Sequence, residues 1–308
     1  MTLQQLSYIV AVDRHRSFAH AAETLGITQP TLSGMIQKLE TELDLRLFDR
    51  NNRKVEPTPA GEKILRQAER VLAEAEQIKE LADNEKNNIS GNLALAVGPS
   101  IAPYILPEFI RRYTTAYPQI NFSVEEMKVE NMFDALLRSH IDAGIAISGN
   151  ARKGIFEIPL YTEKFWVYLS ETCSRNLPVF NPSDLEHENM WIMKDAQCLH
   201  ESAFSFCKSR AKGRNIYQAG NIDTLIRIVD SCGGYTIIPE MHLKFLTARQ
   251  QANVRQLDGG QTSERKISMY IKSDYVRQRM LNTVSNTLLQ FIPHSMAEPK
   301  LAKFGIRL

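Results

Sequence analysis

The stretch FAHAAETLGITQPTLSGMIQKLE, residues 18–40, contains two short helical patterns separated by a turn. Ser17 precedes the first pattern as a helix N-cap, and Gly26 follows it as a glycine C-cap. Thr28 and Pro30 stand at the cap and in the first turn of the second pattern, three residues further on. Two short helices joined by a glycine-containing turn are typical of a helix-turn-helix.

The second of these helices has an apolar side and a polar side. Its apolar residues recur at helical spacing and predict a buried stripe, which consists of Leu32, Met35, Ile36, Leu39 and Leu43. The residues facing away are mostly short near the N-terminus, so they can approach base edges and phosphates in a major groove. The candidate DNA-binding residues of this helix are Gln29, Pro30, Thr31, Ser33, Gln37 and Lys38.

The next stretch, LFDRNNRKVEPTPAG at residues 47–61, predicts a two-stranded wing with asparagines in its turn. Arg50, Arg53 and Lys54 are placed to meet DNA phosphates, although a solvated surface loop is the alternative. Residues 1–60 contain seven Lys/Arg and seven Asp/Glu. The prediction of DNA binding therefore depends on the pattern of residues and not on net charge.

A long helix is predicted from Thr58 and Pro59, as N-cap and first residue, to about residue 87. Its apolar residues alternate in steps of four and three, as in a coiled coil, and are Ile64, Ala68, Val71, Ala75, Ile78 and Ala82. A second copy of the helix is the simplest partner for this stripe, which predicts a dimer. Packing within one chain is the alternative.

Composition limits the class of protein. The 308 residues are 43% hydrophobic and 23% charged with a formal charge of +2, which is ordinary for a soluble chain of two or three domains. No apolar run reaches the ~18–20 residues of a membrane helix, and the N-terminus shows no signal-peptide pattern. We therefore expect a cytoplasmic protein without contact to the membrane. Cys173 and Cys232 are expected to be small buried hydrophobic residues.

After residue 90 strand and helix patterns alternate, which predicts parallel sheets covered by helices. The predicted domains are a winged helix-turn-helix at 1–58, a linker helix at 59–90 and an effector domain at 91–308. The effector domain divides into subdomain I (91–160 and 267–295) and subdomain II (161–266). Ligands of such folds bind in the crevice between the subdomains. The tail after Pro293 is expected to be loose.

These motifs together resemble the LysR-type transcriptional regulators. The resemblance is carried by FAHAAETLGITQPTLSGMIQKLETELDLRLFDR (18–50) and RKVEPTPAGE (53–62), and it extends over the chain. It implies an α/β fold class with an all-α winged helix-turn-helix domain. It also implies an effector domain of two Rossmann-like subdomains, like a periplasmic binding protein.

The segment DAQCLHESAFSFCKSR, residues 195–210, contains Cys198 and Cys207. In one helix, nine steps would place the sulfurs on opposite faces and about 13 Å apart along the axis. A disulfide needs Cα atoms within roughly 7 Å, so its formation would require this segment to refold. Zinc is disfavoured because the spacing does not match structural zinc sites, and two inert core cysteines remain an alternative.

The same segment resembles the hydrogen-peroxide-responsive OxyR branch of the LysR family. That resemblance implies a peroxidatic Cys198 and a resolving Cys207, which would form a reversible disulfide. It further implies support of the thiolate and peroxide pocket by Ser100, Glu201 and Lys272, for which solvated surface positions are the alternative. Gln197 and Val129 depart from the branch, which usually has His and Thr there.

The sequence therefore predicts a peroxide-responsive activator of oxidative-stress genes that is not an enzyme and holds no cofactor or metal. Its expected partners are operator DNA, further copies in a homodimer or homotetramer, hydrogen peroxide as signal, a cellular thiol reductant and RNA polymerase. Its expected location is the cytoplasm, at the nucleoid. One alternative is a LysR-type regulator that binds a small co-inducer between its subdomains. The other is a thiol peroxidase, against which the helix-turn-helix argues.

Overall fold

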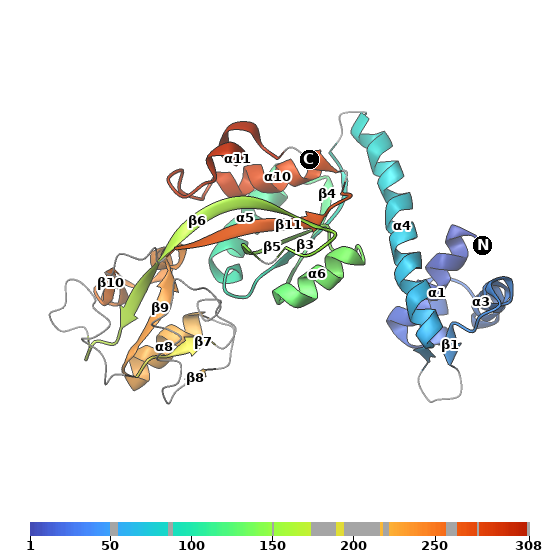
Figure 1. Cartoon of the computed structure of the whole chain (residues 1–308), viewed down its shortest axis with the longest axis horizontal. Coiled ribbons are helices and arrows are strands. Elements are labelled where there is room, and N and C mark those ends of the chain that lie inside the picture. Colours follow the sequence, from blue (N-terminus) through green and yellow to red (C-terminus); the bar gives the residue numbers. More distant parts are fainter. Residues whose placement is uncertain are drawn as a thin grey trace. The chain divides into compact units, whose positions relative to one another are not determined.

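The computed structural model describes residues 1–49, 55–85, 89–149, 151–173, 189–193, 216–217, 222–256, 264–275 and 277–306. The chain forms two compact units, one built on Met1–Ser90 and the other beginning at Gly91 (Figure 1). Among the described residues, none of the helices combines the length and the hydropathy that a bilayer span requires.

The N-terminal unit is a winged helix-turn-helix, as predicted. Both predicted N-caps of the motif are confirmed, because the Ser17 side chain accepts from the backbone of His20 and the Thr28 side chain accepts from that of Thr31. Its elements are α1 (Leu3–His15), α2 (Phe18–Thr24), α3 (Gln29–Leu43), β1 (Phe48–Asp49), β2 (Glu56–Pro57) and α4 (Pro59–Glu85). Strands β1 and β2 pair antiparallel and form the base of the predicted wing.

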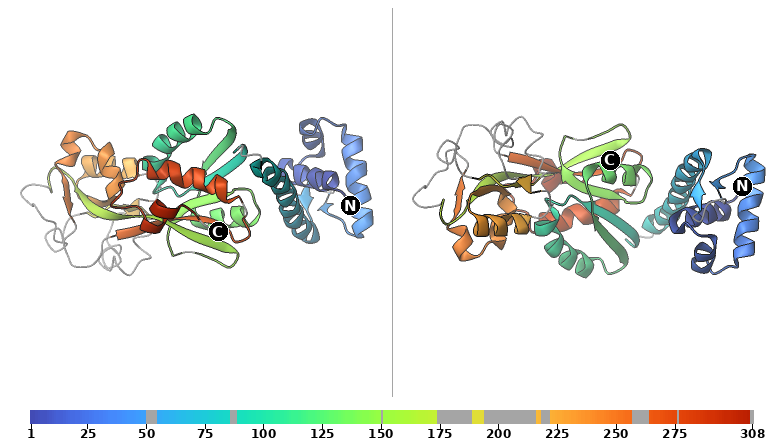
Figure 2. Two further views of the ribbon diagram at one scale, coloured as in Figure 1. Left: turned by 90° about the horizontal axis from the view of Figure 1, so that it is seen from above. Right: turned by 90° about the horizontal axis from the view of Figure 1, so that it is seen from below.

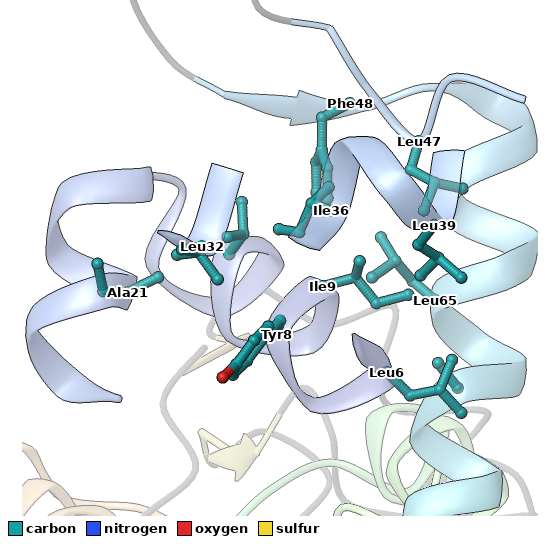
Figure 3. Packing of buried hydrophobic residues seen from close by; sticks show 13 residues of the cluster. Leu6, Tyr8, Ile9, Ala21, Leu32, Ile36, Leu39, Leu47, Phe48 and Leu65 are labelled. Atoms are coloured by element: carbon teal, nitrogen blue, oxygen red, sulfur yellow. The ribbon is translucent and has the colours of Figure 1, made fainter. Parts of the chain in front are cut away.

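Helix α4 packs on the core of its own chain over its first turns. Leu65 and Ala68 lie in one apolar cluster with Ile9 and Leu39, and Ile64 and Val71 pack against that cluster. Figure 3 shows Leu65 among the side chains of α1 and α3. Packing within one chain therefore accounts for the first half of the predicted coiled-coil stripe. Further along the helix the side chain of Ile78 is 69% exposed.

Gly61 allows α4 to approach the chain segment before the wing. A Cβ atom at this position would lie 2.0 Å from the carbonyl oxygen of Leu47. The contact is held by three hydrogen bonds: Thr58 donates from its amide to Leu47 O and from its hydroxyl to Arg46 O, and Gly61 N donates to the Thr58 hydroxyl. The TPAG motif therefore fixes the start of α4 to the wing.

The second unit is built on a mixed seven-stranded sheet. Its strands are β3 (Gly91–Val97), β4 (Ile120–Glu126), β5 (Ala143–Ile147), β6 (Ile155–Leu169), β9 (Tyr235–Pro239), β10 (Val254–Gln256) and β11 (Glu264–Lys272). The order is β10-β6-β11-β5-β3-β4, and β9 also pairs with β6. Strand β3 runs parallel to β4 and β5, whereas β6 and β11 are antiparallel to their neighbours. Within this sheet, the expected parallel pairing is found for β3, β4 and β5 and not for the other described strands.

Helices cover both faces of this sheet, as the alternating pattern predicts. Helix α10 lies beside α5, where the hydroxyls of Tyr113 and Thr283 are 2.8 Å apart (Figure 2). Residues of α6 pack against Ala96 and Tyr270 instead. The remaining elements are α5 (Ala102–Ala116), α6 (Val129–Leu137), β7 (Ile192–Met193), β8 (Ile216–Tyr217), α8 (Ile222–Cys232), η4 (Glu240–Phe245), α9 (Ala248–Gln251), α10 (Gln278–Leu289) and α11 (Pro299–Phe304).

Strand β6 passes from one part of the sheet into another. Its residues Ile155–Lys164 pair with β11, and Phe165–Leu169 pair with β9, while Trp166–Tyr168 also pair with β10. The strands around β3–β5 and the strands around β9 and β10 therefore share one continuous strand, which Figure 1 shows as a long green arrow. The change of partner falls between Lys164 and Phe165.

Residues 294–306, the described part of the tail after Pro293, pack against the second unit, so the expectation of a loose tail was wrong for them. Thr162 N donates to Met296 O and Glu298 N donates to Leu160 O, which adds the tail to the edge of β6. Leu301 and Ile306 are buried, and the Ile306 carbonyl accepts from side chains of α10. The periodicity of α10 ends before this segment, so the sequence pattern did not indicate that it packs.

Deletion of residues 294–308 is expected to lower the free energy of unfolding of the second unit by about 3–6 kcal/mol, since it removes the buried side chains of Ala297, Leu301 and Ile306 and the cover of a strand edge. Chemical denaturation followed by circular dichroism measures the change. Lys300→Ala, at an exposed neighbouring position, is the control and should change stability by less than about 0.5 kcal/mol. A truncated protein as stable as the full chain would contradict the packing role.

Candidate functional site

The predicted DNA-reading residues lie on the outer side of α3. Leu32, Ile36 and Leu39 are completely buried, so the opposite side of the helix faces outward. Ser33 is half-buried, and the other five candidates are exposed: Gln29, Pro30, Thr31, Gln37 and Lys38. The structure therefore brings together the six candidate residues of α3 on one helix. Arg50, Arg53 and Lys54 lie outside the described residues.

Helix α3 is joined to the wing by a carboxylate. Oε1 of Glu40 accepts hydrogen bonds from Leu47 N at 2.7 Å and from Phe48 N at 3.4 Å. The ring of Phe48 also meets that of Phe18 edge to face, with centroids 6.0 Å apart. Helix α3, helix α2 and the base of the wing are therefore held as one body.

Of the predicted sensing residues, Cys198, Cys207, Gln197 and Glu201 lie outside the described residues. Ser100 follows the carboxyl end of β3, and Val129 begins α6 after the carboxyl end of β4. Backbone hydrogen bonds connect these ends, because Met127 N donates to Val97 O and Gly98 N donates to Ile145 O. Ser100 and Val129 thus share the sheet edge at which ligands of open α/β sheets bind.

Lys272 is the last residue of β11, at the opposite end of this strand from Arg265. It pairs with Ile155, whereas Arg265, seven residues earlier in β11, pairs with Glu163. Seven residues of a strand span about 23 Å. Lys272 is buried and forms an ion pair with Asp274 at 3.2 Å. The structure therefore does not bring Lys272 and Ser100 together.

The cation beside Ser100 is Arg265. Its Nη1 donates to the Ser100 hydroxyl at 3.2 Å, and its Nη2 donates to the Ser100 carbonyl at 3.3 Å. The residue is 4% exposed and forms an ion pair with Glu163, from Nε to Oε1, at 2.8 Å. Burial lowers the pKa of this guanidinium, but attraction to the Tyr104 oxygen and to the Glu163 carboxylate outweighs it and raises the pKa. Arg265 is therefore a permanent buried cation.

Two tyrosines complete this buried network. The Tyr104 hydroxyl accepts from Nη2 of Arg265 at 2.7 Å and donates to Oε1 of Glu163 at 2.7 Å. The Tyr161 oxygen is 3.5 Å from that of Tyr104. Burial raises the pKa of both Tyr104 and Tyr161 well above the usual value, so both remain neutral phenols. Together with the Ser100 hydroxyl, the network consists of one cation, one carboxylate and three uncharged hydroxyls.

Sequence reasoning missed Arg265, although the sequence contains a signal for it. In SERKISMYIKS, Arg265 stands two and four residues before Ile267 and Met269, so the alternation of the strand places it on the same face as these two buried residues. A cation at an inward-facing position of a strand is uncommon unless it is paired, so the pattern indicates a buried ion pair. The partner Glu163 is 102 residues away in the chain and could not be identified from spacing.

The other two cysteines differ from the expectation. Cys232 is exposed at the end of α8, so its assignment as a buried hydrophobic residue was wrong. Cys173 is half-buried and packs against the cluster of Val167, Leu169 and Tyr235. Within the described parts of the chain, no group of three or more His, Cys, Asp or Glu is placed to hold a metal ion.

A winged helix-turn-helix joined to a two-part α/β domain, with a buried cation at the ligand edge of the sheet, defines a class of sensor-regulators that bind DNA. Family models agree with this description. Residues 3–62 match the bacterial regulatory helix-turn-helix protein model of the lysR family, and residues 86–293 match the LysR substrate binding domain. The chain belongs to the LysR family of transcriptional regulators.

Its relatives in this family include peroxide regulators. The chain is 32% identical over 244 residues to a hydrogen peroxide-inducible genes activator of Dickeya chrysanthemi, covering 78% of this chain and 80% of the relative. Hydrogen-peroxide-bound mutant OxyR of Corynebacterium glutamicum is 27% identical with a TM-score of 0.59, covering 94% and 92% of the two chains. Full-length mutant OxyR of Pseudomonas aeruginosa has a TM-score of 0.73 at 24% identity, covers 94% of each chain and shows the shared fold.

Proposed function

We propose that this protein is a peroxide-responsive transcriptional activator switched by a reversible disulfide between Cys198 and Cys207. The observation that carries the proposal is the similarity, over about four-fifths of the chain, to relatives named hydrogen peroxide-inducible genes activators. The two cysteines lie nine residues apart, a spacing that one helix could not join by a disulfide without refolding, and this spacing supports it. So does the buried cation at the ligand edge of the sheet.

The proposed chemistry starts with the Cys198 thiolate. The thiolate attacks one oxygen of hydrogen peroxide, the O–O bond breaks, and sulfenic acid and hydroxide are formed. The Cys207 thiol then attacks the sulfenic sulfur, which forms the disulfide and releases water. A thiol exchange with a cellular reductant returns both cysteines to the reduced state.

The described residues suggest how the site supports that step. A nearby cation stabilises a thiolate, and Arg265 supplies a permanent one. Of its five N–H bonds, four have acceptors among the described residues, two of them on Ser100, which leaves one N–H of Nη1 for a ligand. We therefore assign to Arg265 the supporting role that the resemblance implied for Lys272, and we keep Ser100 as the hydroxyl that contacts peroxide. Val129 offers no hydrogen bond, and Gln197 and Glu201 complete the proposed pocket.

On the DNA side, we propose that α3 enters the major groove and reads bases through Gln29, Thr31, Ser33, Gln37 and Lys38, with Pro30 in its first turn. Arg50, Arg53 and Lys54 would contact phosphates at either side of the wing turn. The distal half of α4, with exposed Ile78, would join two chains into a dimer, and two dimers would form a tetramer on the operator. The disulfide would alter promoter contacts, including those to RNA polymerase, at the bacterial nucleoid in the cytoplasm.

The proposed domain division is residues 1–58 for DNA binding, 59–90 for the linker and 91–308 for sensing. The proposed subdomains are 91–160 with 267–295, and 161–266. The change of pairing partner in β6 between Lys164 and Phe165 supports a boundary close to residue 161.

The test is thiol mapping of the purified full-length protein before and after hydrogen peroxide, combined with footprinting on its own promoter. We expect a Cys198–Cys207 disulfide, an altered footprint, and reversal of both by dithiothreitol. Free thiols at both positions after peroxide, with an unchanged footprint, would overturn the proposal.

The match to the LysR substrate binding domain favours a second candidate, a regulator controlled by a small co-inducer at the same sheet edge. Calorimetry of the reduced protein with candidate metabolites distinguishes the two. Saturable binding that alters the footprint without peroxide would favour the co-inducer.

A further inference from the structure

Glu163 occupies an unusual position for a carboxylate. Its side chain is completely buried on β6, directly across from Arg265 on β11, and these two strands pair along the whole length of β11. Burial of a charge is costly unless the charge is paired and hydrogen-bonded. Nothing in the chemistry proposed above uses this carboxylate, so its burial requires another explanation.

Both oxygens of Glu163 are held. Oε1 accepts from Nε of Arg265 at 2.8 Å and from the Tyr104 hydroxyl at 2.7 Å. Oε2 accepts from the backbone N of Met241, in η4, at 3.3 Å. Contacts on both oxygens prevent rotation of the carboxylate, because rotation about its terminal bond would break all of them. Glu163 is thus a fixed acceptor between β11, α5 and η4.

This fixed acceptor determines how the guanidinium is oriented. Glu163 engages Nε of Arg265 and Tyr104 engages one Nη2 hydrogen, so the other Nη2 hydrogen and one Nη1 hydrogen point toward Ser100. The guanidinium is planar and its donors have a fixed fork geometry. When one edge is held, the direction of the opposite edge is set. Without the carboxylate, the buried cation would have to find another acceptor and would turn away from Ser100.

We propose that Glu163 is the positioning residue of the sensing site: it orients Arg265 so that Nη1 faces Ser100 and the peroxide bound beside it. The inference rests on the proposed function, since it assigns the residue that prepares the site for that chemistry. Glu163 acts through Arg265 and does not touch peroxide or the thiol.

Two possible roles of Glu163, a simple charge and a positioning residue, predict different effects of neutralising it on peroxide oxidation. If the carboxylate acted only as a negative charge near the site, its neutralisation would leave the Arg265 charge stronger. The Cys198 thiolate would then be more stable, and peroxide oxidation would be equal or faster. If Glu163 acts by positioning, the same substitution slows peroxide oxidation.

The experiment uses Glu163→Gln in the full-length reduced protein. The amide has the same size, but its NH₂ must face either the Arg265 or the Met241 donor, so the network cannot be satisfied. We measure the second-order rate constant of Cys198 oxidation by peroxide and, separately, its alkylation by iodoacetamide, which needs a thiolate but no oriented peroxide. The ratio of the oxidation rate to the alkylation rate should fall at least about tenfold, because misplacing a reacting group by about 1 Å can lower a reaction rate roughly a hundredfold.

Glu240→Gln is the matched control. Glu240 begins η4 and its Oε2 accepts from Lys164 N, the β6 residue next to Glu163, but within the described parts of the chain it forms no hydrogen bond or ion pair with Arg265. Its ratio should equal that of the wild type. If Glu163→Gln does not fold, Tyr104→Phe removes a different acceptor of Arg265 without burying an unpaired charge. That variant should lower the ratio by about threefold, the worth of a weak hydrogen bond.

An unchanged or increased ratio in a folded Glu163→Gln protein overturns the inference and leaves the proposed function intact, provided that the wild type forms its disulfide. A wild type in which Cys198 is not oxidised by peroxide overturns the proposed function, and the inference with it. Equal losses in Glu163→Gln and Glu240→Gln also overturn the inference, because they would show a general disturbance of η4.

Discussion

Gly61→Ala is expected to destabilise the DNA-binding unit by about 3 kcal/mol or more and to abolish operator binding at physiological salt. The added Cβ would lie 2.0 Å from a backbone oxygen of Leu47, far inside the contact distance, and neither backbone can move freely. Inserted atoms in a packed site cost about 1–3 kcal/mol even where side chains can adjust. Relief requires that α4 move away from the wing, which breaks the hydrogen bonds from Thr58 to Leu47 and Arg46.

The control for Gly61 is Gly34, which is exposed in α3 and would offer open space to a Cβ. Gly34→Ala should stabilise the unit by about 0.5–1 kcal/mol, since alanine has the higher helix propensity. Denaturation of both variants measures the stabilities, and a gel-shift titration of Gly61→Ala with promoter DNA measures binding. Wild-type stability and affinity in Gly61→Ala would show that the close approach of α4 and Leu47 is absent in solution.

Cys198→Ser is expected to abolish the response of transcription to peroxide. A serine hydroxyl is not oxidised by peroxide and forms no sulfenic acid, so neither step of the proposed chemistry can start. Reporter expression in the variant should stay at the uninduced level at every peroxide concentration. Cys207→Ser should still react with peroxide, but it should stop at the sulfenic acid of Cys198, which trapping with dimedone and mass spectrometry would detect.

Cys232→Ser is the matched control for these variants, because Cys232 is an exposed cysteine at the end of α8. It should show wild-type induction. Persistence of the response in Cys198→Ser would contradict the disulfide switch. Loss of the response in Cys232→Ser instead would assign the sensing role to a different thiol.

The helices and strands with strong local patterns could be predicted from the sequence. Caps such as Ser17 and Thr28, the alternation of β4 and the short apolar run of β5 are local features, so their positions agree with the structure within a few residues. The ordered tail could not be predicted, because its burial depends on the edge of β6, more than a hundred residues away.

The candidate site was predictable only in part. The outward side of α3 follows from helical periodicity, which is local, and it agrees with the exposure of Gln37 and Lys38. The cation beside Ser100 did not follow, because β11 has basic residues near both ends and the sequence does not say which end meets Ser100. The pairing of β11 with β6 and β5 places Arg265 there.

The carboxylate bridge from Glu40 to the backbone of Leu47 and Phe48 has a consequence for how any signal could reach DNA. A DNA-binding unit in which α3 and the wing are fixed to each other is rigid and keeps one shape. On the proposed function, oxidation elsewhere in the chain would regulate a promoter by changing the spacing or the angle between the DNA-binding units of two chains. It would not act by changing the surface that each DNA-binding unit presents to its half-site of the operator.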